Sequence, residues 1–135
     1  MAIFRLFSGL HAVSCGVLPS GFLGVRRLRN RRIDTLFNEL RQFRTSHVII
    51  WANYLESVAA LNEALPTAFP QIPVYTLHGR VPATERAAKI DLWKKRGGVL
   101  VATQGTGGYG LTLTESHQVF FYSENWRYAL RLQAE

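Results

Sequence analysis

Apolar residues recur along this chain with helical spacing in some stretches and as unbroken runs in others. One face of a predicted helix carries Ile33, Leu36, Phe37, Leu40 and Phe43. The run HVIIW at 47–51 follows at once and is typical of a buried strand. From residue 33 onward, the pattern therefore predicts a helix followed by a strand.

The same alternation continues to the end of the chain. Strands are predicted at 72–77, 99–102 and 118–122. Helices are predicted at 53–65, from Pro82 to Gly97, and from Asn125 onward, the second with an apolar face formed by Ala83, Ala87, Ile90 and Trp93. Strands that alternate with helices predict an α/β fold in which a buried parallel sheet is flanked by helices on both faces.

Residues 1–32 differ from the rest of the chain. The stretch 1–24 is apolar, and we interpret it as a partly buried helix with a glycine-rich exit rather than a secretory leader. Five arginines follow within 26–32, and the whole chain carries a net charge of +7. This excess favours an anionic partner such as nucleic acid, although a solvated charged surface is the alternative for the arginine run. We divide the chain into a lead-in segment, 1–32, and one domain, 33–135.

The stretch GTGGYG at 105–110 matches the glycine pattern of dinucleotide-binding proteins. That pattern needs a crossover helix after the glycines, and the next predicted strand begins too soon for one. We therefore interpret the match as a coincidence of spacing. What remains is a glycine-rich loop at the carboxyl end of a parallel strand, where α/β sheets bind ligands. The glycines serve either a tight turn between strands or the close approach of a ligand to the backbone.

Four segments in order resemble the motifs of superfamily-two helicases, specifically the Snf-type double-stranded DNA translocases and their phage relatives. The stretch TQGTGGYGLTL at 103–113 is similar to motif V, and VIIWAN at 48–53 is similar to motif IV. The stretch YTLHG at 75–79, with Arg86 beyond it, resembles the next conserved block. The stretch RLQAE at 131–135 resembles the opening of motif VI. The resemblance implies the second RecA-like lobe of such an enzyme, truncated within motif VI.

The resemblance also implies which residues contact the phosphates of DNA. Backbone amides of Gly107 and Gly108 would bind phosphate, with side-chain contacts from Thr103 and Gln104. The remaining phosphate contacts would come from Asn53, His78 and Gly79. Asn53 has an alternative structural role as an N-cap, because Glu56 stands three residues on. His78 has the alternative of a purely structural role.

The nucleotide site of the complete enzyme would lie between two lobes. Gly110 and Gln133 would lie near ATP, and the arginine finger is expected beyond Glu135. The chain contains no Walker A sequence, so ATP and Mg²⁺ are expected in the complete enzyme and not in this fragment alone. We expect no metal site and no catalytic residue here. The expected partners are DNA, bound nonspecifically, and the missing first lobe, with no membrane, in a cytoplasmic protein of bacterial or phage origin.

The sequence departs from the Snf-type pattern at two positions, and two rival functions are consistent with it. Gln104 and Thr112 stand where Snf-type remodellers usually have Thr and Asn, so chromatin remodelling is not inferred. One rival is a non-catalytic basic α/β module that binds nucleic acid without an ATPase partner. The other is a small nucleotide-binding enzyme domain that uses the loop 105–110.

Overall fold

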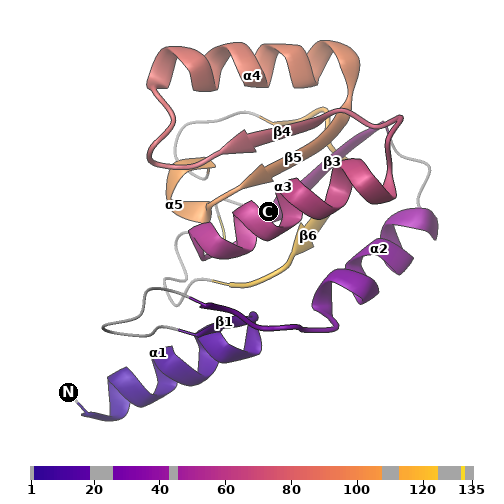
Figure 1. The fold of residues 1–135 in the computed structure, drawn as a ribbon. Coiled ribbons are helices and arrows are strands. Elements are labelled where there is room, and N and C mark those ends of the chain that lie inside the picture. The colour runs from indigo at the N-terminus through magenta and orange to yellow at the C-terminus, as the bar shows by residue number, and fades with distance from the viewer. Residues whose placement is uncertain (1, 19–25, 43–45, 108–112, 125–131, 133–135) are drawn as a thin grey trace.

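A four-stranded parallel sheet forms the centre of the molecule (Figure 1). The computed structural model describes residues 2–18, 26–42, 46–107, 113–124 and 132. The strands are β3 (His47–Trp51), β4 (Val74–Leu77), β5 (Gly98–Ala102) and β6 (Gln118–Phe121), and they lie in the order β4-β5-β3-β6. The helices of this domain are α2 (Arg32–Gln42), α3 (Leu55–Ala68), α4 (Ala83–Arg96) and the single turn α5 (Gln104–Gly107).

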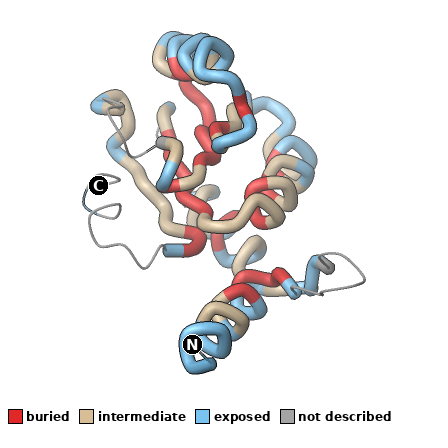
Figure 2. The backbone as a smooth tube through the Cα atoms, turned by 90° about the vertical axis from the view of Figure 1, so that its left-hand side faces the viewer, coloured by how far each residue is buried: buried red, intermediate tan, exposed pale blue. Residues whose placement is uncertain are grey.

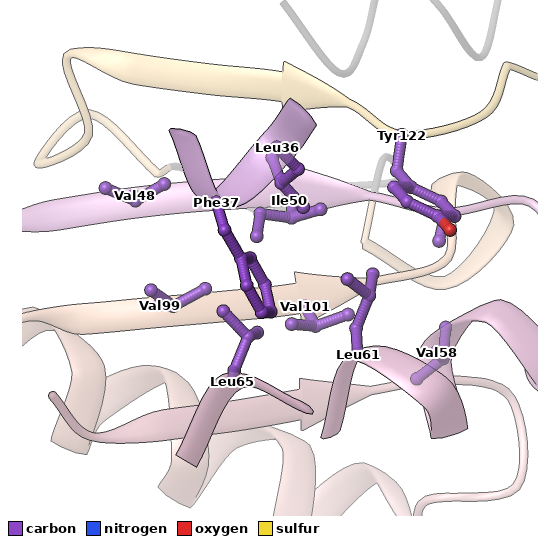
Figure 3. Close-up of a cluster of buried hydrophobic side chains, with 11 residues drawn as sticks. Leu36, Phe37, Val48, Ile50, Val58, Leu61, Leu65, Val99, Val101 and Tyr122 are labelled. Atoms are coloured by element: carbon purple, nitrogen blue, oxygen red, sulfur yellow. The ribbon is translucent and has the colours of Figure 1, made fainter. Parts of the chain in front are cut away.

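Helices cover both faces of the sheet, because successive side chains of each strand point to opposite faces. Figure 3 shows the face on which strand residues such as Val48, Ile50 and Val101 meet Phe37 of α2 and Leu61 of α3. On the other face, Ile49 and Leu100 pack with Ile90 and Trp93 of α4. The predicted α/β fold with helices on both faces is confirmed.

The amino edge of the sheet, where the parallel strands begin, is held by two glycines. Gly97 and Gly98 have φ values of 72° and 111°, in the region that favours glycine. An added Cβ on Gly97 would overlap the carbonyl oxygen of Ser46, and one on Gly98 would overlap that of Pro73. The predicted stop of α4 at this pair is confirmed, and β5 begins at its second glycine.

Three local predictions were wrong. The residue that caps α3 is Tyr54, without a side-chain hydrogen bond, so Asn53 is not the N-cap and Glu56 does not complete a capping box. On α4, Ala83 and Ala87 are exposed, and only the last two turns pack against the sheet. Residues 104–107 form a helical turn where a loop was expected. The predicted last helix, from Asn125 onward, lies outside the described residues.

The lead-in segment contains α1 (Ala2–Ser14) and a two-stranded antiparallel ladder of β1 (Val17–Leu18) and β2 (Arg26–Arg27). The predicted helix therefore forms, but Ala12 is its only buried residue, and Figure 2 shows α1 largely exposed at the periphery. An ion pair of 2.6 Å joins Arg27 to Glu63 of α3. The division into 1–32 and 33–135 stays a prediction.

Polar contacts join the end of α1 to the domain. Arg32 donates to the carbonyl oxygen of Tyr122 at 2.7 Å and to Ser14 Oγ at 3.3 Å. A hydrogen bond of 2.8 Å joins His11 Nδ1 to Tyr54 Oη. Burial lowers the pKa of His11, the charge of Arg32 lowers it further, and Glu124 opposes both. His11 is therefore neutral at neutral pH and can share this hydrogen bond.

Candidate nucleic-acid interface

The carboxyl ends of all four parallel strands meet at one edge of the sheet, which we call the carboxyl edge. It consists of the residues that directly follow each strand: 52–54 after β3, 78–81 after β4, 103–107 after β5 and 122–124 after β6. Three of these four segments contain residues that the sequence predicted as phosphate contacts. Segments that lie 15 to 24 positions apart along the chain are thus brought to a single surface by the strand order.

The segments after β4 and β5 form one unit within this edge. The backbone N–H of Thr103 donates to the carbonyl oxygen of Leu77 at 3.1 Å, which continues the strand pairing by one step. Thr103 Oγ1 and Thr106 Oγ1 lie 3.0 Å apart, and Thr106 N–H donates to the Thr103 carbonyl oxygen at 3.0 Å. A Cβ placed on Gly79 would lie 3.8 Å from Thr106 Oγ1. Gly79 and the two threonines are therefore neighbours.

The turn after β4 fixes the orientation of the His78 ring. Val81 N–H donates to the His78 carbonyl oxygen at 2.9 Å, and Arg80 N–H donates to His78 Nδ1 at 3.2 Å. Because Nδ1 accepts a hydrogen bond, the proton of the neutral ring is on Nε2. Nε2 is thus a hydrogen-bond donor, as a phosphate oxygen requires. The His78 side chain is partly exposed, and Arg80 is exposed beside it.

Asn53 lies at the same edge but two strands away from His78. Strands in a sheet are about 4.8 Å apart, so the two residues are separated by roughly 10 Å across the sheet. Asn53 N–H donates to Ser123 Oγ at 2.7 Å, and the Ser123 side chain is buried. Ser123 in turn follows Tyr122, whose N–H donates to the Trp51 carbonyl oxygen at 2.9 Å. The ends of β3 and β6 therefore hold the backbone of Asn53 in place.

Two glycines of the carboxyl edge are not required by the backbone. The φ angles of Gly79 and Gly105 do not lie in the left-handed region. A Cβ on Gly105 would meet no atom within 4 Å, and one on Gly79 would make only an ordinary contact. Of the two interpretations of the glycine-rich loop, a tight turn therefore does not explain Gly105. Both positions leave room for a ligand to come close to the backbone.

Comparison with known protein families identifies the domain. The model of the helicase conserved C-terminal domain matches residues 31–135, which is most of the chain. The chain belongs to this helicase C-terminal domain family. No curated protein matched the sequence in a direct comparison.

Solved structures with the same fold include two helicase domains. One is the crystal structure of the C-terminal part of the Fun30 ATPase domain, with a TM-score of 0.68 and 20% identity over 80% of this chain. The other is domain 2 of the DEAD-box helicase Mss116p bound to an RNA duplex, with a TM-score of 0.61 and 22% identity over 77% of this chain. The chain spans 38% and 40% of the length of these two chains. The RecA-like architecture of a helicase second lobe is thereby shown.

Within this helicase C-terminal domain, the predicted site residues are not equally placed. Asn53, His78 and Thr103 are partly exposed and Gly79 is exposed, all at the carboxyl edge. Gln104 begins α5, but it is only 1% exposed. This burial favours a structural role for its side chain rather than a surface contact. Gly107 ends α5. Gly108, Gly110, Thr112 and Gln133 lie outside the described residues, and their roles stay predictions.

Sequence reasoning missed three residues of the same edge. Thr106 bonds to Thr103, Arg80 bonds to His78 through its backbone, and Ser123 accepts from Asn53. Thr106 could have been found, since it lies inside the glycine-rich motif. Arg80 could have been found too, since it directly follows the predicted His78 and Gly79, whereas only the strand order makes Ser123 a neighbour of the site.

The described residues contain no cluster of three His, Cys, Asp or Glu side chains that could hold a metal ion. Over the same part of the chain, no helix is long and apolar enough to cross a membrane. The carboxyl edge offers hydroxyl, imidazole and amide donors, one exposed arginine, Arg80, and one exposed carboxylate, Glu124. The donors of this edge suit the binding of an anion.

Proposed function

We propose that this chain is the second lobe of an ATP-dependent, Snf-type DNA helicase or translocase, and that its carboxyl edge binds the phosphate backbone. The observation that carries the proposal is the meeting of the segments after β3, β4 and β5 at one edge. These segments are the ones whose sequences resemble motif IV, the following block and motif V. Membership of the helicase C-terminal domain family supports the same assignment.

His78, Gly79, Thr103 and Thr106 bind one phosphate in this proposal. His78 Nε2 and the Thr106 hydroxyl are the donors, Thr103 donates its own hydroxyl proton to Thr106 and so orients it, and the absence of a side chain on Gly79 lets the backbone come close. Asn53, roughly 10 Å away across two strands, contacts a second position along the backbone. Phosphates repeat identically along any sequence, so binding of this kind suits movement along a strand without sequence preference.

ATP and Mg²⁺ belong to the complete two-lobe enzyme in this proposal. Gly110 and Gln133 contribute to the nucleotide site from this lobe. The described residues contain no metal-binding cluster, and the sequence has no phosphate-binding P-loop with its lysine. ATP, when bound, would supply the phosphoanhydride bond that is hydrolysed between the two lobes. The isolated chain is therefore expected to show no DNA-stimulated phosphate release.

The test is a binding titration of the purified chain with a fluorescent duplex DNA at increasing salt. For the two phosphate contacts proposed, raising salt from about 50 mM to about 200 mM should weaken binding roughly 12-fold, equally for unrelated sequences. Binding that ignores salt, or that prefers one sequence strongly, contradicts the proposal. Phosphate release from ATP by the isolated chain favours instead the small nucleotide-binding enzyme.

An RNA duplex of matched length and sequence tests the choice of nucleic acid. The structural neighbour Mss116p domain 2 was solved with an RNA duplex, so RNA is the specific alternative to DNA. Tighter binding to DNA than to RNA supports the Snf-type assignment. Preferential binding to RNA would move the chain toward RNA-dependent helicases. If the complete protein had no ATPase activity, the rival function of a non-catalytic module that binds nucleic acid would be favoured.

A further inference from the structure

Helix α1 is amphipathic, but its large apolar side chains face solvent, and its small and polar residues face the rest of the molecule. Its buried residue is Ala12, and the partly buried residues are the small or polar Ser8, Gly9 and His11. Its large apolar residues are exposed instead: Ile3 70%, Phe4 67%, Leu6 61%, Phe7 56%, Leu10 57% and Val13 41%. These six account for more than half of the eleven large hydrophobic side chains that are exposed among the described residues.

The exposed residues form a continuous stripe that faces away from the domain. At 100° per residue, Ile3, Leu6, Phe7, Leu10 and Val13 fall within an arc of about 120°. The centre of this arc is opposite the side on which Ala12 and Ser8 contact the rest of the molecule. Helix α1 is held by its last turns, through the His11–Tyr54 and Arg32–Ser14 hydrogen bonds. The stripe is therefore presented outward on an anchored helix.

We propose that this outer stripe of α1, defined as Ile3, Leu6, Phe7, Leu10 and Val13, pairs with the same stripe of a second copy of the chain. Four of these residues follow the spacing 3-4-3 (Ile3, Leu6, Leu10, Val13), which is the a/d repeat of two helices packed by knobs into holes. A two-fold pair is self-complementary, so one stripe meets its own copy. The pairing is independent of the nucleic-acid function proposed above.

The area of the stripe is sufficient for a pair. A fully exposed leucine or phenylalanine presents about 200 Å², so the five residues offer on the order of 500 Å² per copy and about 1,000 Å² in a pair. That value is close to the lower limit of specific protein interfaces. An apolar patch of this size on a monomer generally marks an interaction site. The pair is therefore expected to be reversible.

A bilayer surface is the other occupant that an apolar stripe suits, and two features favour a helix instead. Helices that lie in a membrane interface carry lysine and arginine on the face opposite the apolar one. In α1 the opposite face holds a single basic residue, Arg5, at its exposed start, and its other residues, Ser8, Gly9, His11 and Ala12, are the partly or fully buried ones, with His11 bonded to Tyr54 of the domain. The a/d spacing also fits the grooves of a second helix, which a fluid bilayer does not require.

Sedimentation equilibrium of the full chain from about 1 µM to about 100 µM tests the proposal. The chain should show a monomer–dimer equilibrium. The double variant Leu6→Lys/Leu10→Lys should remain monomeric throughout, at least about 30-fold weaker in association, because two charges would be buried in the seam. The matched control Ala87→Lys/Ala88→Lys adds the same charge at exposed positions of α4 and should dimerise like the unchanged chain.

A second variant separates loss of the seam from charge repulsion. Leu6→Gln/Leu10→Gln removes the apolar contacts without adding charge and should also weaken the dimer. Circular dichroism confirms that each variant keeps its helix content. A monomeric unchanged chain, a dimer that survives both stripe variants, or a control that dissociates equally would overturn the proposal. Binding of the monomeric chain to vesicles of phosphatidylcholine and phosphatidylserine, abolished by the stripe variants, would also overturn it in favour of a bilayer.

Discussion

The two ends of the parallel sheet use glycine for different reasons. At the amino edge, Gly97 and Gly98 have positive φ values and stand against the carbonyl oxygens of Ser46 and Pro73. At the carboxyl edge, Gly79 and Gly105 have neither property, and a Cβ fits at both. Glycine is therefore required by the fold at one edge and is not required by it at the other.

This difference separates stability from function within one small domain. A glycine that the backbone needs is explained by the folded chain alone. A glycine makes the unfolded chain more flexible and so lowers stability. Where no backbone conformation requires it, its presence indicates that a ligand approaches the backbone there. The same contrast extends to charge: exposed arginines occur at both edges, Arg80 beside His78 and Arg96 at the end of α4. A glycine or an arginine can therefore be substituted at one edge and the result compared with the same kind of substitution at the other edge.

The largest effect is expected from Gly98→Ala. Alanine at a φ of 111° is strained, and its Cβ would overlap the Pro73 carbonyl oxygen, so the start of β5 must shift. We expect a loss of roughly 3 to 5 kcal/mol in the free energy of unfolding. Urea denaturation followed by circular dichroism measures it. A midpoint equal to that of the unchanged chain would remove the distinction between the two edges.

The fold was predictable from the sequence because its strands are unambiguous. The run at 47–51 has no polar interruption, and β3 begins and ends at the predicted residues. The strand β4 was predicted two residues too long, at 72–77 rather than 74–77. The sidedness of α4 was not predictable from spacing alone. Ala83 and Ala87 share its apolar face, but only Ile90 and Trp93 reach the sheet.

The candidate site was predictable in part, because its contacts join distant segments. The capping pattern at Asn53 is local, whereas its N–H is bound by Ser123, 70 residues away. Arg80 follows His78-Gly79 directly and Thr106 lies inside the glycine-rich motif, but the two segments meet each other only through the adjacency of β4 and β5. A single sequence contains motifs in order but does not state the order of strands in the sheet. For this reason the motif residues were found and the residues that support them were not.

A smaller effect, on binding alone, is expected from Gly105→Ala. Alanine favours helix over glycine, and there is space for its Cβ, so the free energy of unfolding should stay equal or rise by up to about 1 kcal/mol. If the phosphate proposed at Thr103 and Thr106 also approaches the backbone of Gly105 between them, affinity for duplex DNA should fall about 10-fold, because the methyl group would hold that phosphate away. Parallel denaturation and binding titrations measure both. Unchanged affinity would show that the carboxyl edge keeps this glycine for another reason.

The smallest effect is expected from a matched pair of arginine substitutions. Arg80→Ala and Arg96→Ala each remove one exposed positive charge, so the net charge of the two variants is identical. Arg80 lies beside His78 at the carboxyl edge, whereas Arg96 ends α4 near the start of β5, at the amino edge. If phosphates bind at the carboxyl edge, Arg80→Ala should weaken duplex binding about 3-fold to 5-fold at low salt and reduce the salt dependence by about one contact. Arg96→Ala should change affinity less than about 1.5-fold, since its charge acts only at long range through a screening electrolyte. Equal losses in the two variants would mean that DNA responds to the overall charge of the chain and not to the carboxyl edge.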